Sequence, residues 1–193
     1  MGSNYNYVNL FPTVVHVLEV SNFGDIKQQL IDFTYECKKE KEGRVVSNIG
    51  GWQSDLMGFD DDVIDRVLLD TIPSLPIKQT SAKLTKWINI NGPGSYNKRH
   101  HHPQCHLSGV FWIKCPSKCG DLTFDSPFNF LSYDEMNNYK DDFKDKNFIY
   151  EDYTLFPKEG AIVVFPSHIL HEVGANLSKD DRISVAFNIT FDA

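Results

Sequence analysis

The spacing of hydrophobic positions changes along the chain. Residues 14–20 have the pattern of a strand, and apolar residues from Ile26 to Cys37 then recur at helical spacing. A second helical pattern follows the acidic run 60–62, whose charges favour a helix N-terminus, and it stops near Pro73. The N-terminal part is therefore expected to form one strand and then two helices.

From Leu84 onward apolar and polar residues alternate, as they do in half-buried strands, with Gly, Pro and Asn between the segments. Strands that follow a helical preamble predict an α+β, mostly β chain, folded as a sandwich or barrel with the helices on one outer face. The expected strands contain the sequences WININ, LSGVFWIK, DLTF, AIVVF and RISVAFNITF.

A length of 193 residues with 41% hydrophobic content predicts a single domain over 1–193. Its parts are helical support over about 1–82 and a barrel core over about 83–193. The acidic, aromatic segment 127–152 is too long for a hairpin turn and is expected to be a lid, an outer helix or a solvated insertion. Substrate specificity is expected in this segment and in 48–59.

The net charge of -7 argues against general nucleic-acid binding and against attraction to an anionic membrane. The chain has no apolar run of membrane-spanning length and no signal peptide pattern at its start, so a soluble, cytoplasmic protein is expected. Its four cysteines are too few and too irregular for a disulfide framework and are expected to be free thiols. A homo-oligomer is left open.

Histidine is concentrated in one short segment. Four of the seven histidines lie within residues 100–106, directly before an apolar strand. Alternate side chains share a face on an extended backbone, so His100 and His102 are expected to point together into the interior while His101 points away. His171, after the strand 161–165, is a third candidate ligand. Imidazole groups of this kind suit iron, zinc or copper.

One face of the last predicted strand is polar at its start. Arg182 and Ser184 share that face, and Ile183 and Val185 lie on the other. A guanidinium group makes two parallel hydrogen bonds to a carboxylate, and a water-poor interior strengthens them. Arg182 could instead form a salt bridge at the barrel mouth, but its place after the histidines favours a carboxylate site.

This order of paired ligands, a distant histidine and then an arginine resembles the 2-oxoglutarate and Fe(II)-dependent oxygenases. The resemblance covers nearly the whole chain and is strongest to an uncharacterised subgroup from bacteria and marine phages. The glycine-rich approach and Tyr96 before the first ligand are similar to the prolyl hydroxylase branch. The segments that carry the resemblance are SNIGGWQS, WININGPGSYNKRHHHP, LSGVFWIKCP, GDLTFDSP, EGAIVVFPSHILH and RISVAFN.

The resemblance implies a double-stranded β-helix, a barrel of the jelly-roll or cupin type, in a bacterial or phage-infected cell. It implies that the chain is a dioxygenase in which His100, His102 and His171 hold Fe(II), with 2-oxoglutarate and O2 as co-substrates. The favoured reaction is hydroxylation of an unidentified substrate, with a peptidyl proline as the first guess.

Further cofactor-binding residues follow from the same resemblance. Arg182 with Ser184 would hold the distal carboxylate of 2-oxoglutarate. Tyr96 and Asn89 are added as polar candidates because they lie near the ligand strand in the sequence.

The sequence departs from the family pattern at one ligand. The usual set is two histidines and one carboxylate, in the pattern His-x-Asp/Glu, whereas His102 stands at the carboxylate position. Asp121 on the next strand is a possible substitute. Two other readings stay open: a cupin-like enzyme with three histidines that does not use 2-oxoglutarate, and a catalytically silent barrel that acts as a binding module.

Overall fold

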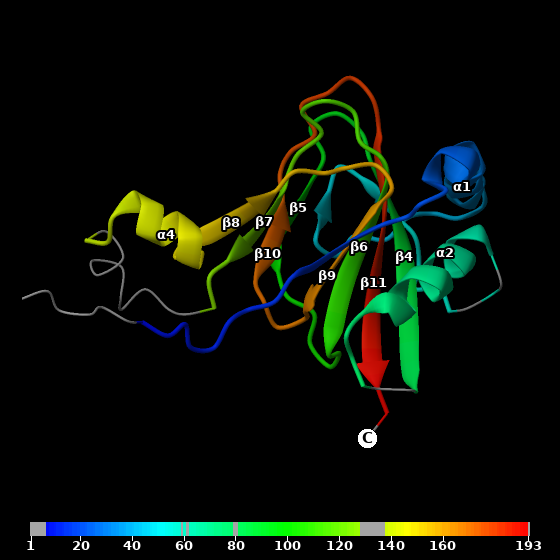
Figure 1. Cartoon of the computed structure of the whole chain (residues 1–193). Coiled ribbons are helices and arrows are strands. Elements are labelled where there is room, and N and C mark those ends of the chain that lie inside the picture. The colour runs from blue at the N-terminus through cyan, green and yellow to red at the C-terminus, as the bar shows by residue number, and fades with distance from the viewer. Residues whose placement is uncertain (1–6, 59, 61, 79–80, 128–137, 193) are drawn as a thin grey trace, which may run out of the picture.

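The computed structural model describes residues 7–58, 60, 62–78, 81–127 and 138–192. Within this part of the chain, two antiparallel sheets face each other, one of six strands in the order β1-β9-β6-β11-β4-β3 and one of five in the order β2-β5-β10-β7-β8. The helices α1 and α2 cover the outer face of the six-stranded sheet (Figure 1). The predicted β body with helices on one side is confirmed.

The strands are β1 His16–Glu19, β2 Asn48–Ile49, β3 Trp52–Gln53, β4 Ala82–Asn91, β5 Tyr96–His100, β6 Leu107–Lys114, β7 Leu122–Asp125, β8 Asp152–Leu155, β9 Ala161–Pro166, β10 His171–Val173 and β11 Arg182–Phe191. The helices are α1 Phe23–Glu40, α2 Val63–Thr71, the short 3-10 helix η1 Ile72–Ser74 and α4 Asp141–Asn147. Five of these strands, β2, β3, β5, β8 and β10, are not separate segments in the hydrophobic pattern, because they are short or carry polar and histidine side chains.

The start of α2 follows from its acidic N-terminus. The Asp62 side chain accepts a hydrogen bond from the backbone N–H of Asp65, and the Asp65 side chain accepts one from the N–H of Asp62, which completes a capping box. Asp65 also pairs with Lys86 of β4, and both of these side chains are fully buried. The helix is thereby fixed to the sheet by charge as well as by its apolar face.

The hydrophobic core has two layers, divided by the six-stranded sheet. Along β11, Ile183, Val185 and Phe187 face the helices and pack with Leu30 of α1 and Leu68 of α2. The second layer lies between the two sheets and contains Trp112, Leu122, Phe124, Val163, Phe165 and Ile169. The opposite face of β11, which carries Arg182 and Ser184, is therefore turned toward the second sheet.

Two further expectations concern the cysteines and the insertion. All four cysteines are free thiols, as predicted. The expected insertion 127–152 includes α4 and the first residue of β8, and its residues 128–137 lie outside the described part. Among the helices of the described residues, none combines the length and the apolar character needed to cross a membrane.

Candidate metal centre

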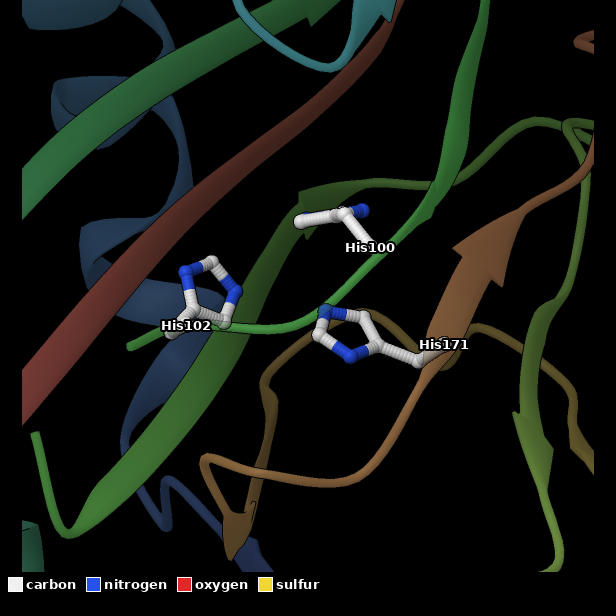
Figure 2. Close-up of side chains that lie close together, drawn as sticks. All are labelled: His100, His102 and His171. Atoms are coloured by element: carbon white, nitrogen blue, oxygen red, sulfur yellow. The ribbon is translucent and has the colours of Figure 1, made fainter. Parts of the chain in front are cut away.

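Three histidines from two neighbouring strands converge between the sheets. His100 ends β5 and pairs directly with His171, the first residue of β10. His102 follows two residues after β5, where its backbone N–H donates to the Ser167 carbonyl at 2.9 Å. One ring nitrogen from each histidine lies within 4.8 Å of the other two (Figure 2). His101, between two of them, is exposed, so the predicted alternation is confirmed.

Hydrogen bonds orient two of the three imidazoles. The Nδ1 atom of His100 lies 2.6 Å from the Lys98 carbonyl oxygen, and the Nδ1 atom of His171 lies 2.9 Å from that of Ile169. A carbonyl oxygen accepts only, so each Nδ1 carries the proton and each Nε2 keeps its lone pair. Backbone partners of this kind commonly orient histidine ligands of metals.

Burial keeps the three imidazoles neutral. It lowers the pKa of His102 to about 3, with further lowering from the charges of His171 and His100. It lowers the pKa of His171 to about 4, against the opposing effect of the Ile169 hydrogen bond, and the pKa of His100 is also lowered, mainly by burial. Neutral imidazole is the form that binds a metal ion, so the cluster is ready to bind one at neutral pH.

Arg182 and Ser184 face the same space from the opposite sheet. In the ladder of β11 and β4, Arg182 pairs with Asn91 and Ser184 pairs with Asn89. Arg182 is 2% exposed, and its Nη1 donates to the carbonyls of Cys119 and Gly174. Its Nη2 is buried and has no hydrogen-bond partner among the described residues. A buried donor without a partner is costly, which indicates a place for an acceptor from a ligand.

Gly120 makes room for this arginine. Its φ of +92° is in the left-handed region, and a Cβ atom there would lie 2.1 Å from the Gly174 carbonyl oxygen and 2.6 Å from Arg182 Nη1. A larger residue would therefore displace either the backbone or the guanidinium group. Arg182 can therefore occupy its observed position only because residue 120 is glycine.

One cavity is lined both by the histidine cluster and by the polar residues of β4 and β11. It is lined by His100, His102 and His171 on one side and by Arg182, Ser184 and Asn89 on the other. Its volume of about 50 Å³ is room for several water molecules. The further lining residues are Ser47, Trp87, Asn97, Gly109, Val110, Trp112, Leu122, Phe165, Val173 and Ala186.

Sequence reasoning missed part of this wall. Trp87 and Trp112 are buried like core residues, but they also line the cavity, and the centroid of the Trp87 ring lies 5.5 Å from that of His102. Alternation along β4 predicts that Trp87 also faces the cavity, because Trp87 lies on the same face of the strand as Asn89. Asn97 had no such signal, because its strand was not predicted as a separate segment.

Other candidates lie apart from the cluster. Tyr96 is 38% exposed and is not among the residues that line the cavity, because the neighbouring Asn97 takes the inward position on β5. Asp121 is not a member of the metal-ligating group found among the described residues. Its charge acts on Arg182 and Cys119 instead, so a substitute carboxylate from this residue is not supported. His106 and His168 are exposed.

The residues that line the cavity fit a divalent transition metal at the three histidines and a small molecule with a carboxylate group at Arg182. Three neutral imidazoles provide nitrogen ligands of the type that Fe(II), Zn(II) and Cu(II) accept. Arg182 Nη2 and Asn89 Oδ1 are buried and have no hydrogen-bond partner among the described residues, so the cavity wall offers one donor and one acceptor to a ligand or to water.

Comparison with known proteins agrees with this geometry. The sequence model of the family described as "Putative 2OG-Fe(II) oxygenase" matches residues 85–188, more than half of the chain, and these include all three histidines, Arg182 and Ser184. No curated protein matches the chain.

Solved structures share the fold at low sequence identity. A prolyl-4-hydroxylase from Pseudomonas putida is 14% identical, with a TM-score of 0.60 over 94% of each chain. A prolyl hydroxylase from Trichoplax adhaerens, solved with a hypoxia inducible factor peptide, is 13% identical, with a TM-score of 0.60 over 92% of this chain and 83% of that one. HygX from Streptomyces hygroscopicus, solved with nickel and 2-oxoglutarate, is 13% identical, with a TM-score of 0.54 over 92% and 83%. The predicted double-stranded β-helix is confirmed.

Proposed function

Because the chain belongs to the 2OG-Fe(II) oxygenase family, we propose that it hydroxylates an unidentified substrate at the histidine cluster between its sheets. Enzymes of this family use Fe(II), 2-oxoglutarate and O2. The chemistry that bound iron supplies is oxidative decarboxylation of 2-oxoglutarate to succinate and CO2, coupled to oxidation of a substrate C–H bond. His100, His102 and His171 would hold the metal.

The observation that carries the proposal is the Nη2 atom of Arg182, which is buried beside the cavity of the three imidazoles and has no hydrogen-bond partner in the described part of the chain. In the proposal, Arg182 binds the distal carboxylate of 2-oxoglutarate, and the Ser184 hydroxyl donates a second hydrogen bond to it. Carbonyl acceptors hold Nη1 in place, so the guanidinium group is oriented before the ligand arrives. Trp87 and Trp112 line the same space and shield it from bulk solvent, which strengthens that charge-assisted contact.

His102 would give this centre an unusual charge. Three neutral imidazoles leave the metal more positive than two imidazoles and a carboxylate do. The carboxylate of 2-oxoglutarate that chelates the metal would then supply negative charge that a protein ligand usually provides. We therefore expect metal and 2-oxoglutarate to strengthen each other's binding in this chain.

The test is an anaerobic titration of metal-free protein with Fe(II) and then 2-oxoglutarate, followed by visible absorption. We expect the metal-to-ligand charge-transfer band of a chelated 2-oxo acid, and we expect its 2-oxoglutarate midpoint to rise at least tenfold in Arg182→Lys, which keeps the charge but loses the planar fork. Val46→Ala, at a position 61% exposed, is the matched control. Circular dichroism of each variant reports whether it is folded.

The position of His102 also favours a second candidate, a three-histidine metalloenzyme that does not use a 2-oxo acid. It predicts tight metal binding, no band with 2-oxoglutarate, and no effect of Arg182→Lys. Observation of that combination would replace the oxygenase proposal.

The first substrate to assay is a peptide that contains proline. The fold likeness to prolyl hydroxylases supports this choice. Oxygen incorporation into such a peptide, measured by mass spectrometry, tests it independently of the site assignment.

A further inference from the structure

A row of cross-strand partners connects the metal centre to the edge of the five-stranded sheet. His100 pairs with His171, His171 pairs with Phe124 of β7, and Phe124 pairs with Tyr153 of β8. Directly opposed residues in antiparallel strands point to the same face, so all four side chains face the other sheet. The next pair, Thr123 and Thr154, hydrogen-bonds at 3.0 Å on the opposite face, which agrees with this alternation. Tyr153 thus lies on the same face as the metal centre.

Tyr153 belongs to an exposed aromatic cluster, which we define as Phe148, Tyr150 and Tyr153. The ring centroids are 5.8 Å apart for Tyr150 and Tyr153, 6.0 Å for Phe148 and Tyr153, and 6.5 Å for Phe148 and Tyr150. Phe148 is 70% exposed and Tyr153 is 43% exposed. Phe148 ends α4 in a left-handed conformation, and its N–H donates to the Lys144 carbonyl, so the turn fixes its direction. Large aromatic side chains held together in the open mark a binding surface.

The cluster has a negative neighbour. The Tyr150 hydroxyl donates to Asp145 Oδ1 at 3.0 Å, and Asp145 forms no ion pair within the part of the chain that the structure describes. Aromatic ring faces attract cations, and a carboxylate beside them adds a full opposite charge. Lys144 and Lys146 flank Asp145 in α4, and Lys144 pairs with Asp141 at 2.9 Å. Lysine and arginine side chains match both the rings and the Asp145 carboxylate, whereas an acidic side chain matches neither.

We propose that the exposed aromatic cluster docks a lysine or arginine side chain of an extended peptide substrate, and so places a residue a fixed distance away at the metal centre. The proposal rests on the proposed function, because it assumes that oxidation occurs at the histidine cluster. It adds a substrate class, a basic peptide, and a recognition site on β8 and the end of α4 (Figure 1).

Strand spacing sets the shortest distance between the two positions. Adjacent strands lie about 4.8 Å apart, so Tyr153 on β8 is about 10 Å from His171, two strands away on β10. An extended peptide advances about 3.3 Å per residue. Because Phe124, between these positions, is buried in the core, a peptide has to pass around its side chain. The basic residue should therefore lie at least about three residues from the oxidised one.

A peptide library tests the spacing. Octapeptides with lysine fixed at one position and uncharged residues elsewhere, proline included, are incubated with the iron-loaded protein, 2-oxoglutarate and O2. We expect oxygen incorporation three or more residues from lysine and none at its immediate neighbours, at least tenfold above that in a matched library with glutamate at the fixed position. Equal incorporation in the two libraries, or incorporation without regard to the distance from lysine, would overturn the proposal.

Binding tests the cluster without turnover. Fluorescence anisotropy with labelled libraries should give a Kd about tenfold lower for lysine than for glutamate, and Phe148→Ala and Tyr153→Ala should each remove most of this preference. Phe156→Ala is the matched control, because Phe156 is 76% exposed and outside the cluster. A lysine preference that is absent from the native chain, or that survives Tyr153→Ala, contradicts the proposal.

The two proposals fail in different ways. His171→Ala should lose metal binding and keep the lysine preference in anisotropy. A native chain that shows the preference without the charge-transfer band would refute the oxygenase site alone. A chain that shows the band without the preference would refute the docking site alone.

Discussion

At the scale of residues, the centre depends on which side chains face the space between the sheets. Three imidazoles face it, and each has its pKa lowered mainly by burial. His101 lies between two of them in the sequence but is exposed. His101 is therefore an internal control for replacements of the three clustered histidines.

Single histidine replacements should separate ligands from neighbours. We expect His102→Ala and His171→Ala to weaken Fe(II) binding by more than the roughly 10- to 100-fold that loss of an outer hydrogen-bond partner causes. His101→Ala should leave the affinity unchanged. Anaerobic equilibrium dialysis measures all three, and unchanged binding in His102→Ala would remove that residue from the ligand set.

The lowered pKa values also predict how the metal-free chain responds to acid. An unfolded histidine titrates near pH 6.5, whereas His102 and His171 titrate near 3 and 4 when folded. Below pH 6.5 the unfolded chain therefore binds more protons, and stability falls as the pH drops toward 4. Urea unfolding between pH 7.5 and 5.5 should show this fall.

The matched variant for the acid response is His102→Gln, which cannot gain a proton in this range. Its free energy of unfolding should depend less on pH than that of the native chain. An equal slope in the two proteins would show that this imidazole is not the source of the acid sensitivity.

At the scale of elements, β4 and β11 divide their side chains between two tasks. One face of each strand packs against helices, and the other presents Asn89, Arg182 and Ser184 to the cavity. The helices therefore support the site from behind, through apolar contacts and through the buried pair of Asp65 and Lys86.

Replacement of Asp65 should show how much that buried pair contributes to the free energy of unfolding. Asp65→Ala removes a buried carboxylate that pairs with the Lys86 ammonium group, leaves Asp62 at 3.0 Å from it, and removes part of the capping box. We expect a loss of about 3–5 kcal/mol in the free energy of unfolding. Asp70→Ala, at an exposed position of the same helix, should change it by less than about 0.5 kcal/mol. Similar values for the two variants would contradict a structural role for the pair.

At the scale of the whole molecule, much of the architecture was readable from the sequence. Strands β6 and β11 match the predicted runs LSGVFWIK and RISVAFNITF residue for residue. Strand β11 has an unambiguous period of two because one of its faces is apolar, whereas β6 is apolar on both faces and is recognised by its length and by the turn residues that flank it. The alternation of His100, His101 and His102 followed from the same rule.

The rest depends on contacts between distant segments. Strands β8 and β10 have 4 and 3 residues, and their places are fixed by pairing with β7 rather than by their own pattern. Gly120 and the carbonyls of Cys119 and Gly174 orient Arg182 from loops that carry no recognisable signal. Nearness in the sequence points to Tyr96, whereas strand pairing turns Asn97 to the cavity.

The most direct test of the iron site is a crystal structure of the chain with Mn(II) in place of iron and with 2-oxoglutarate, grown without O2. We expect one metal ion bonded to His100, His102 and His171, with the distal carboxylate of 2-oxoglutarate on the Nη2 atom of Arg182. A metal ion held without His102, or 2-oxoglutarate bound away from Arg182, would contradict it.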